Sequence, residues 1–446
     1  MTQRDIIAAI ATAPGRGGIG VVRISGRDLL RFVSDLVSKP LQARRAVLTA
    51  FRDSAGESID EGIALFFPAP HSYTGEDVIE LQGHGGPVVM RQLLQRCVEL
   101  GARLARPGEF TERAYLNGRM DLAQAEGVAD LIEASTALAA RAALRSLQGN
   151  FSELIQELAS KIVALRTLLE ATLDFPEEEV EFLTAGRAAD QLTAIREQLE
   201  RVIASTRQGS LLREGIQAVL IGEPNVGKSS LLNRLAGEDV AIVTDVPGTT
   251  RDAVREQIDI DGLPVHIIDT AGLRETDDAV ERIGISRTWT QIEKADLALV
   301  VSDTAGAYDS GHQAIIDRLP AGLARIRVLN KIDLSARPAG RETCGNEDQV
   351  WVSAKTGAGL DQLKQAIWDR AGWHPSGEGL FTARARHMAA LQSAQAHLAQ
   401  AAAQTRHLEL YAEELRLAHE ALCAITGEFT PDDLLGEIFS KFCIGK

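Results

Sequence analysis

Short apolar segments alternate with helical patterns over the first 118 residues of the chain. Two segments, residues 28–38 and 88–100, have the three- and four-residue spacing of amphipathic helices. Five others are short and rich in β-branched residues, as expected of strands: residues 6–11, 19–24, 47–51, 63–67 and 78–81. The pattern predicts a small α/β domain over residues 1–118.

A long stretch without proline, residues 121–174, follows with helical periodicity. Its apolar positions predict one continuous stripe along a long helix: Leu147, Phe151, Leu154, Leu158, Ile162, Leu165 and Leu169. A second stripe follows an acidic break at residues 175–179 and consists of Leu192, Ile195, Leu199 and Ile203. The acidic break is typical of an exposed turn between helices and not of a metal site.

The last part of the chain is helical again. Residues 383–425 are rich in alanine and leucine, and Thr430 and Pro431 predict the N-cap and first residue of a final helix. Helical segments therefore lie on both sides of residues 213–373. We predict a helical domain in two parts, residues 119–212 and 374–446, interrupted by an inserted domain over residues 213–373.

The inserted domain begins with a phosphate-binding pattern. An apolar strand pattern at residues 218–221 precedes the spacing G-x-x-x-x-G-K-[ST] at residues 222–229, and a helical pattern follows. Backbone N–H groups of such a loop hold phosphate oxygens, Lys228 adds a positive charge near the β- and γ-phosphates, and Ser229 can bind Mg²⁺. A chance glycine-rich turn is the alternative, but it explains neither the strand before the loop nor the helix after it.

Three further motifs, each at the end of a predicted strand, define the nucleotide. The carboxylate of Asp269 is placed to hold the Mg²⁺ shell, and Asp333 can accept hydrogen bonds from both N1–H and the exocyclic amine of guanine. The motifs are Asp269, Thr270, Ala271 and Gly272; Asn330, Lys331 and Asp333; and Ser353, Ala354 and Lys355. They predict a GTPase. Leu273 cannot orient the attacking water, so a polar group must do so, and several carboxylates of residues 274–282 are candidates.

Two other glycine-rich segments lie in the N-terminal domain. Residues 15–20 fit G-x-G-x-x-G, but a strand pattern follows them in place of the helix that a dinucleotide site requires. Residues 83–87 are interpreted as a strand-to-helix connection, with a ligand-facing loop as the alternative.

Composition and charge restrict the remaining classes. The chain has 446 residues, of which 45% are hydrophobic and 24% charged, as expected of a globular protein with several domains. It has no apolar run long enough for a membrane span and no signal peptide, so we expect a cytoplasmic protein without membrane contact. Its four scattered cysteines are expected to be free thiols. With a net charge of −15, nucleic acid must be bound through a local basic patch or a partner.

Several motifs resemble one family. Residues 244–252, together with Asn225, resemble the potassium-activated GTPases of the Era-like group. Residues 106–114, 121–126 and 442–446 are similar to the tRNA uridine-5-carboxymethylaminomethyl modification GTPase family, MnmE or TrmE, and the resemblance covers essentially the whole chain. It implies a multidomain α/β plus all-α fold. The parts would be an N-terminal dimerisation and folate-binding domain, a discontinuous helical domain and an inserted Ras-like P-loop GTPase domain.

The resemblance also implies the site residues. Glu281 matches the family's water-orienting glutamate, and Arg119 stands where a lysine is expected. GTP contacts would include Asn225, Val226, Gly227, Lys228, Ser229, Ser230, Thr244, Thr249 and Thr250. Mg²⁺ would be bound by Ser229 and Thr250, and K⁺ by Asn225, Thr244, Val246 and Thr249. A tetrahydrofolate derivative, 5-formyl or 5,10-methylene, would be bound by Arg23, Glu80, Arg119 and Lys446. Cys443 is either a buried small residue or a reactive thiol beside the folate, and its C-terminal context excludes prenylation.

The implied function is a homodimeric, K⁺-stimulated GTPase that forms a heterotetramer with a flavin-containing MnmG-like partner, which would carry FAD. Together they would add an aminomethyl or carboxymethylaminomethyl group to C5 of the wobble uridine (position 34) of certain tRNAs. Two alternatives stay open: a ribosome-assembly GTPase that binds RNA without covalent chemistry, and a folate-dependent enzyme with a regulatory GTPase domain and no RNA substrate.

Overall fold

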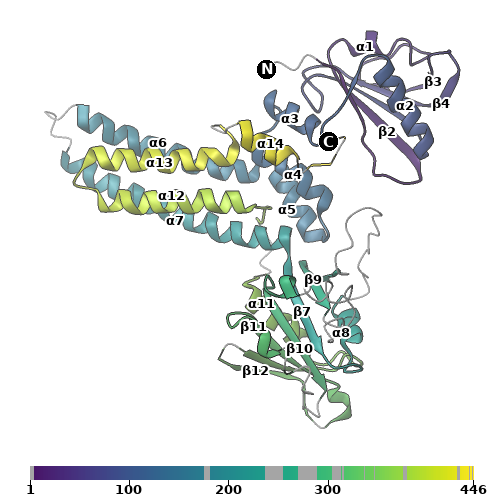
Figure 1. Cartoon of the computed structure of the whole chain (residues 1–446). Helices are drawn as coiled ribbons and strands as arrows, with labels where there is room; N and C mark the ends of the chain where they lie inside the picture. The colour runs from purple at the N-terminus through teal and green to yellow at the C-terminus, as the bar shows by residue number, and fades with distance from the viewer. Residues whose placement is uncertain are drawn as a thin grey trace. The chain divides into compact units, whose positions relative to one another are not determined.

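The computed structural model divides the chain into two compact units (Figure 1). The first consists of Met1–Ala129, Ser146–Ile195 and Ser393–Lys446, and the second of Asp130–Arg145 and Arg196–Gln392. The structure describes residues 5–174, 181–236, 255–269, 289–303, 313, 316–335, 337–345, 347–374, 379–428, 432–440, 442–443 and 445. Among these residues no helix combines the length and apolar character that crossing a membrane requires.

The first unit begins with a six-stranded sheet of order β3-β4-β5-β2-β1-β6. Its strands are β1 (Ile7–Ile10), β2 (Gly17–Gly26), β3 (Val47–Arg52), β4 (Ser58–Phe67), β5 (Asp77–Gly85) and β6 (Arg103–Leu104). Helices α1 (Leu29–Phe32) and α2 (Pro87–Glu99) pack on one face, where Val22, Ile79 and Leu93 belong to a fully buried core. Because side chains alternate along a strand, Arg23 and Glu80 lie on the opposite face.

The predicted strands of this domain are confirmed, and one predicted helix is too long. The expected helix over residues 28–38 ends at Phe32. Beyond it the chain pairs with β3, since Val37 forms a bridge with Phe51 and the N–H of Ser38 donates to Ala50 O at 3.1 Å. Residues 17–26 form a strand, which confirms that residues 15–20 do not open a dinucleotide site. Residues 83–87 run from β5 directly into α2, as a strand-to-helix connection does.

The helices after the sheet are more broken than the sequence pattern predicts. Residues 121–174 form α4 (Leu122–Glu133), α5 (Ala137–Leu147) and α6 (Asn150–Asp174) in place of one long helix. Gly149, at φ +95°, separates α5 from α6, so Leu147 does not belong to the α6 stripe. Within α6 the buried stripe includes Ile155, whereas Leu154 is only half-buried.

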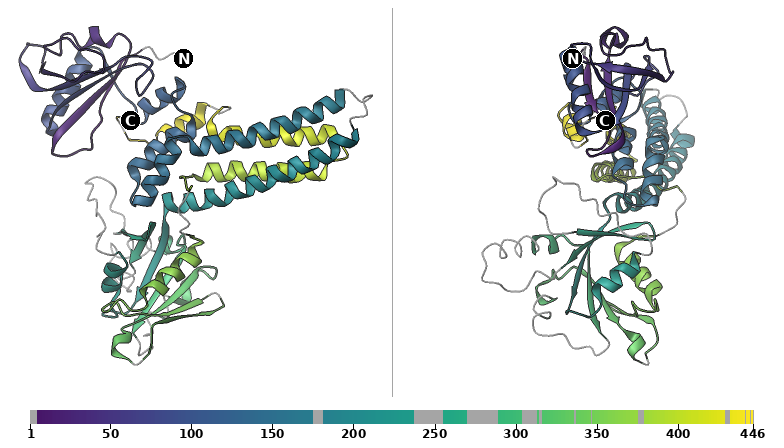
Figure 2. Two further views of the ribbon diagram at one scale, coloured as in Figure 1. Left: turned by 180° about the vertical axis from the view of Figure 1, so that it is seen from behind. Right: turned by 90° about the vertical axis from the view of Figure 1, so that its right-hand side faces the viewer.

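The C-terminal helical region consists of three helices. Residues 383–425 form α12 (Ala385–Ala403) and α13 (Leu408–Thr426), with a break at residues 404–407 that the sequence pattern did not predict. Helix α13 packs along α6 (Figure 2). The last helix, α14 (Asp432–Ser440), packs on α3 (Glu109–Leu116) through a cluster that includes Phe439 and Phe442. Its predicted cap, Thr430 and Pro431, lies outside the described residues. Helices α7 (Glu181–Glu214) and α12 each contribute residues to both units.

The second unit contains a seven-stranded sheet of order β12-β13-β11-β10-β7-β9-β8. Its strands are β7 (Ile216–Gly222), β8 (Arg255–Ile260), β9 (Leu263–Asp269), β10 (Leu297–Asp303), β11 (Ala324–Asn330), β12 (Gly340–Cys344) and β13 (Glu347–Trp351). The inner strands are parallel, and buried apolar clusters cover both faces of the sheet. The predicted motifs therefore follow strands that end at the same edge of the sheet, where ligands bind in open α/β folds.

Contacts in this unit attach α5 to the sheet and join the helical segments to one another. The Thr136 hydroxyl, just before α5, donates to Gly262 O in the β8–β9 turn at 3.1 Å. A Cβ at Gly262 would lie 2.8 Å from the Leu138 side chain, so α5 rests closely on this turn. Asp130 accepts hydrogen bonds from Arg213 of α7 and from Arg384, just before α12, at 2.9 and 2.8 Å.

The close packing of Gly209 in α7 gives a stability prediction. A Cβ at Gly209 would lie 2.0 Å from the backbone oxygen of Phe381, so Gly209→Ala must displace the backbone. We expect it to lower the free energy of unfolding by about 1–3 kcal/mol, seen as a lower melting temperature in calorimetry. The matched control is Gly436→Ala in α14, where no heavy atom lies within 4 Å of the new Cβ. An equal loss of stability in both variants would contradict the packing argument.

Candidate functional site

The phosphate-binding loop follows β7, which lies between β9 and β10 in the sheet. Gly222, the last residue of β7, has no room for a side chain because a Cβ would lie 2.4 Å from Val301 O. The loop then turns through left-handed backbone at Asn225 (φ 65°) and Gly227 (φ 94°), and helix α8 (Lys228–Leu235) begins directly after it. The free N–H groups and dipole of a helix N-terminus favour an anion, so the predicted phosphate cradle is formed.

The charged side chain of the loop, Lys228, is bonded to the backbone of the same loop. Lys228 Nζ donates to the backbone oxygens of Gly222 and Glu223 at 2.7 and 3.0 Å. These bonds fix the ammonium group beside the loop backbone, where it can approach a bound phosphate. Ser229 and Ser230 occupy the first turn of α8, so their hydroxyls and N–H groups belong to the same helix end.

Asn330, the last residue of β11, connects the loops of the site. It is 2% exposed, and its Nδ2 donates to Val226 O in the phosphate loop at 2.8 Å. Its Oδ1 accepts from the N–H of Ala354, in the loop after β13, at 3.0 Å. A Cβ at Gly227 would lie 2.5 Å from Asn330 Nδ2, so the contact also requires the glycine. One buried amide thus holds the phosphate loop and the predicted base-binding loop together.

Asp333, the carboxylate predicted to recognise guanine, has a hydrogen-bond partner at one of its two oxygens. Ser353 Oγ donates to Asp333 Oδ1 at 2.6 Å, and the same hydroxyl accepts from the N–H of Thr356 at 3.1 Å. No described residue bonds Asp333 Oδ2. Lys331, at φ 66°, turns the chain from β11 into the short 3₁₀ helix η1 (Ile332–Leu334) that carries Asp333. The structure therefore brings Asn330, Asp333 and Ser353 together, and Lys355 follows in the same loop.

Several predicted site residues cannot be placed in this geometry. β9 ends at Asp269, so that motif begins at the same edge of the sheet, although its side chain lies outside the described residues. The others outside the described residues are Thr244, Val246, Thr249, Thr250, Thr270, Ala271, Gly272, Glu281 and Lys446.

The two central residues predicted for folate form a pair in the first unit. β2 and β5 are in a register that sets Arg23 opposite Glu80, and Arg23 Nε and Nη2 donate to Glu80 Oε1 at 3.1 and 2.9 Å. The guanidinium carbon lies 5.2 Å from the ring centre of Tyr73 and 5.8 Å from that of Phe110. Both charged groups remain partly accessible, so the pair offers donors and a carboxylate oxygen to the amide-like edges and carboxylates of a folate.

The other two folate predictions have different outcomes. Arg119 is exposed and lies beside Gly75, where a Cβ would be 3.2 Å from Arg119 Cγ. Among the described residues it forms no hydrogen bond or ion pair with Glu80. Lys446 is outside the described residues, but the chain just before it is placed. Gly445 lies against β1, since a Cβ there would be 2.4 Å from Ile10 O.

Cys443 lies in the same C-terminal segment. Its backbone oxygen accepts from the N–H of Gly108 at 3.3 Å, and its side chain is exposed. The buried-residue alternative for Cys443 is therefore wrong. Since Gly445 contacts β1, and β1 pairs with β2 beside Arg23, the C-terminal segment reaches the strand next to the one that carries Arg23.

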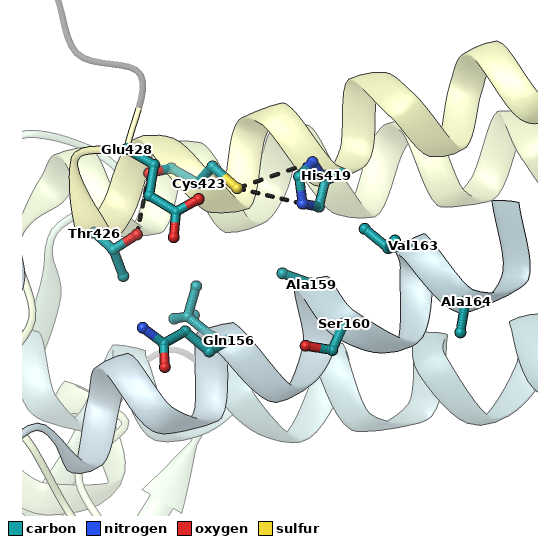
Figure 3. A pocket seen from close by; sticks show the side chains of 10 residues that line it. Gln156, Ala159, Ser160, Val163, Ala164, His419, Cys423, Thr426 and Glu428 are labelled. Atoms are coloured by element: carbon teal, nitrogen blue, oxygen red, sulfur yellow. Dashed lines mark hydrogen bonds between the residues drawn. The ribbon is translucent and has the colours of Figure 1, made fainter. Parts of the chain in front are cut away.

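A cavity between α6 and α13 was not predicted from the sequence (Figure 3). It has a volume of about 470 Å³, and its polar lining includes Gln156, Ser160, His419 and Cys423. Cys423 Sγ lies 3.5 Å from His419 Nε2. Burial raises the pKa of the Cys423 thiol to about 12, so it stays protonated at neutral pH and is a poor nucleophile. Among the described residues no cluster of three metal-binding side chains occurs.

Comparison with known proteins places the whole chain. The family model "GTP-binding protein TrmE N-terminus" matches residues 6–119, and "MnmE helical domain" matches residues 122–443. The tRNA modification GTPase MnmE of Azoarcus sp. (strain BH72) is 61% identical over 443 residues, which cover 99% of this chain and 98% of that protein. The protein of the same name from Nitrosomonas europaea is 58% identical over 451 residues, with complete coverage of both.

The chain belongs to the MnmE family. Membership of the MnmE family confirms the predicted GTPase and its fold class. A solved structure of Aquifex aeolicus Era bound to GDP·AlF4⁻ is 26% identical, covers 41% of this chain and 66% of that one, and has a TM-score of 0.26. At this TM-score the likeness adds nothing to the MnmE assignment.

The role of Asn330 gives a prediction for nucleotide binding. Asn330→Ala leaves Val226 O and the Ala354 N–H without their partner, and each unsatisfied buried group costs about 1–3 kcal/mol. We expect GDP and GTP to bind at least roughly tenfold more weakly in fluorescence titrations. Asn233→Ala, at an exposed position of α8 in the same domain, is the control and should bind normally. Unchanged affinity in Asn330→Ala would contradict the bridging role.

Proposed function

We propose that this chain hydrolyses GTP to support the addition of an aminomethyl or carboxymethylaminomethyl group to C5 of the wobble uridine of certain tRNAs. Its family consists of tRNA modification GTPases, which makes it a GTP hydrolase that acts in tRNA modification. The observation that supports the nucleotide site is the Asn330 bridge, because it joins the phosphate loop to the loop of Ser353, whose hydroxyl holds Asp333.

For hydrolysis, GTP would bind along the loop from Asn225 to Ser230, with guanine against Asp333 and the loop of Ser353, Ala354 and Lys355. Mg²⁺ would be held by Ser229 and Thr250, and it would supply positive charge to the phosphates. Because Leu273 cannot orient water, Glu281 would position the attacking molecule.

A potassium ion is the proposed source of further positive charge. Asn225, Thr244, Val246 and Thr249 would hold K⁺ where other GTPases use an arginine finger against the charge that develops on the phosphates. The left-handed backbone at Asn225 supports a special role for this position, since such backbone is uncommon for residues other than glycine.

The N-terminal domain is proposed to provide the carbon. A tetrahydrofolate derivative would bind at Arg23 and Glu80, with Arg119 and Lys446 as further contacts, and it would carry the one-carbon unit. Support comes from the partly accessible Arg23–Glu80 pair and from the exposed Cys443 on the segment that reaches β1. The active form would be a homodimer that assembles with a flavin-containing, MnmG-like subunit. GTP hydrolysis would move the inserted domain, residues 213–373, and would not itself drive the carbon transfer.

The proposal is tested by mass analysis of wobble nucleosides. A deletion strain should lack the C5-modified uridines, and a plasmid that encodes this chain should restore them. If the deletion leaves the modified nucleosides at their normal level, a role in ribosome assembly or in folate metabolism without an RNA substrate replaces the proposal.

The cation site gives a separate prediction. We expect GTP turnover to be faster in K⁺ than in Na⁺ at equal ionic strength, because a smaller ion fits the proposed ligands less well. Asn225→Ala should abolish the difference between the two salts, whereas the control Asn233→Ala should keep it. Equal turnover of the unaltered protein in the two salts contradicts the proposed K⁺ site.

A further inference from the structure

A histidine and a carboxylate form a pair at the end of β5 that has no part in the chemistry described above. His84 Nδ1 lies 2.8 Å from Asp60 Oδ1 of β4, and the backbone N–H of His84 donates to Asp60 Oδ2 at 2.7 Å. The Asp60 side chain is 9% exposed, whereas that of His84 is 75% exposed. The pair thus has a buried acid and an accessible imidazole.

The protonation of the pair follows from its hydrogen bonds. Burial alone would raise the pKa of Asp60, but the backbone and ring hydrogen bonds from His84, with the N–H of Glu61, lower it below its ordinary value. An ionised carboxylate can only accept, so Nδ1 of His84 carries the hydrogen. In the neutral ring Nε2 then has a lone pair, and no described residue bonds it. This is the arrangement of a proton-transfer histidine oriented by an acid.

A purely structural role explains the backbone bond but not the ring. The N–H groups of His84 and Glu61 already satisfy Asp60, and the bond from His84 joins β4 to β5. One neighbouring glycine is required by the pair, because a Cβ at Gly83 would lie 2.5 Å from Asp60 Oδ2. Gly85 is required by the packing against β2, where a Cβ would lie 2.7 Å from Gly17 O. The segment before α2 therefore leaves room for the Asp60 carboxylate beside His84.

The position of His84 connects it to the proposed folate site. Alternate residues of β5 share a face, so His84 lies on the same face as Glu80 and its partner Arg23, four residues or about 13 Å along the strand. We propose that His84 is a proton-transfer residue of the one-carbon chemistry and that Asp60 is its positioning residue. This inference rests on the proposed function of the N-terminal domain.

The proton balance of the reaction gives His84 its task. Replacing hydrogen at C5 of uridine by carbon forms a C–C bond and breaks the C5–H bond, which releases one proton. In 5,10-methylene-tetrahydrofolate the carbon is bonded to two nitrogens. Breaking the first C–N bond leaves a nitrogen that takes up one proton, and an amine, ammonia or glycine, then displaces the second nitrogen, which takes up the proton that the amine loses. His84 Nε2 accepts the proton from C5 and returns it to the first nitrogen, and because the carbon enters at the methylene level the exchange needs no oxidant or reductant.

The test compares His84→Gln and Asp60→Asn with His71→Gln, an exposed histidine of the same domain, as control. The first readout is the tautomer of His84, measured by NMR on protein labelled with ¹⁵N-histidine. The second is the affinity for 5-formyl-tetrahydrofolate, and the third is the rate of wobble-uridine modification with the flavin subunit. GTP turnover and melting temperature verify that each variant is folded.

We expect hydrogen on Nδ1 of His84 in the unaltered protein and a shift toward Nε2 in Asp60→Asn. His84→Gln should lower the modification rate by about 10²–10⁴-fold while 5-formyl-tetrahydrofolate binding and GTP turnover stay unchanged. His71→Gln should resemble the unaltered protein. A normal modification rate in His84→Gln overturns the inference, as does a loss of folate binding that accounts for the lower rate. If the unaltered protein neither binds the folate nor supports modification, the proposed function itself fails.

Discussion

The nucleotide site depends on one buried side chain, the amide of Asn330. It reaches from the end of β11 to Val226 in the phosphate loop and to Ala354 after β13, so it joins segments that are separated by more than a hundred residues of sequence. Only an amide supplies a donor and an acceptor from one planar group, since a carboxylate at this position would face the Val226 oxygen with a second acceptor. Because the site is buried, either lost bond would leave a polar group without water. The phosphate loop and the base-binding loop are thus held as one unit before any nucleotide binds.

In the first unit a buried carboxylate, Glu109, joins separate segments of the chain as Asn330 does in the nucleotide site. Glu109 is fully buried and accepts from Arg103 Nη2 at 2.7 Å and from Arg113 Nη2 at 3.1 Å. Burial alone would raise the pKa of Glu109, but these hydrogen bonds lower it below its ordinary value. Gly108, beside it, has φ 67° and would place a Cβ 2.6 Å from Phe439 O. The motif at residues 106–114, which carries part of the family resemblance in the sequence, therefore packs α3 against α14 and positions the C-terminal segment.

The sequence predicted most of the elements that carry the nucleotide site, because strand, loop and helix follow one another within a few residues there. It could not predict features that depend on distant partners. Helix α1 ends early because Val37 pairs with β3, and the cavity between α6 and α13 joins residues more than 250 positions apart. The pattern of residues 83–87 predicts a strand-to-helix connection, and the backbone forms one. The hydrogen bond between His84 and Asp60 could not be predicted from the sequence, because nothing in the spacing of β4 and β5 relates the two residues.

The central claim is that modification by this chain requires GTP bound at Asp333, and a change of base specificity tests it most directly. Ser353 Oγ donates a hydrogen bond to Asp333 Oδ1. In Asp333→Asn the side-chain carbonyl oxygen can keep that bond, while the new amide NH2 group faces the base. Xanthine presents an oxygen where guanine presents its amine, so this variant should prefer xanthosine triphosphate. With the flavin subunit and tRNA, we expect Asp333→Asn to modify the wobble uridine with xanthosine triphosphate and not with GTP. Modification that continues unchanged with GTP, or that fails although xanthosine triphosphate is hydrolysed, would contradict the claim.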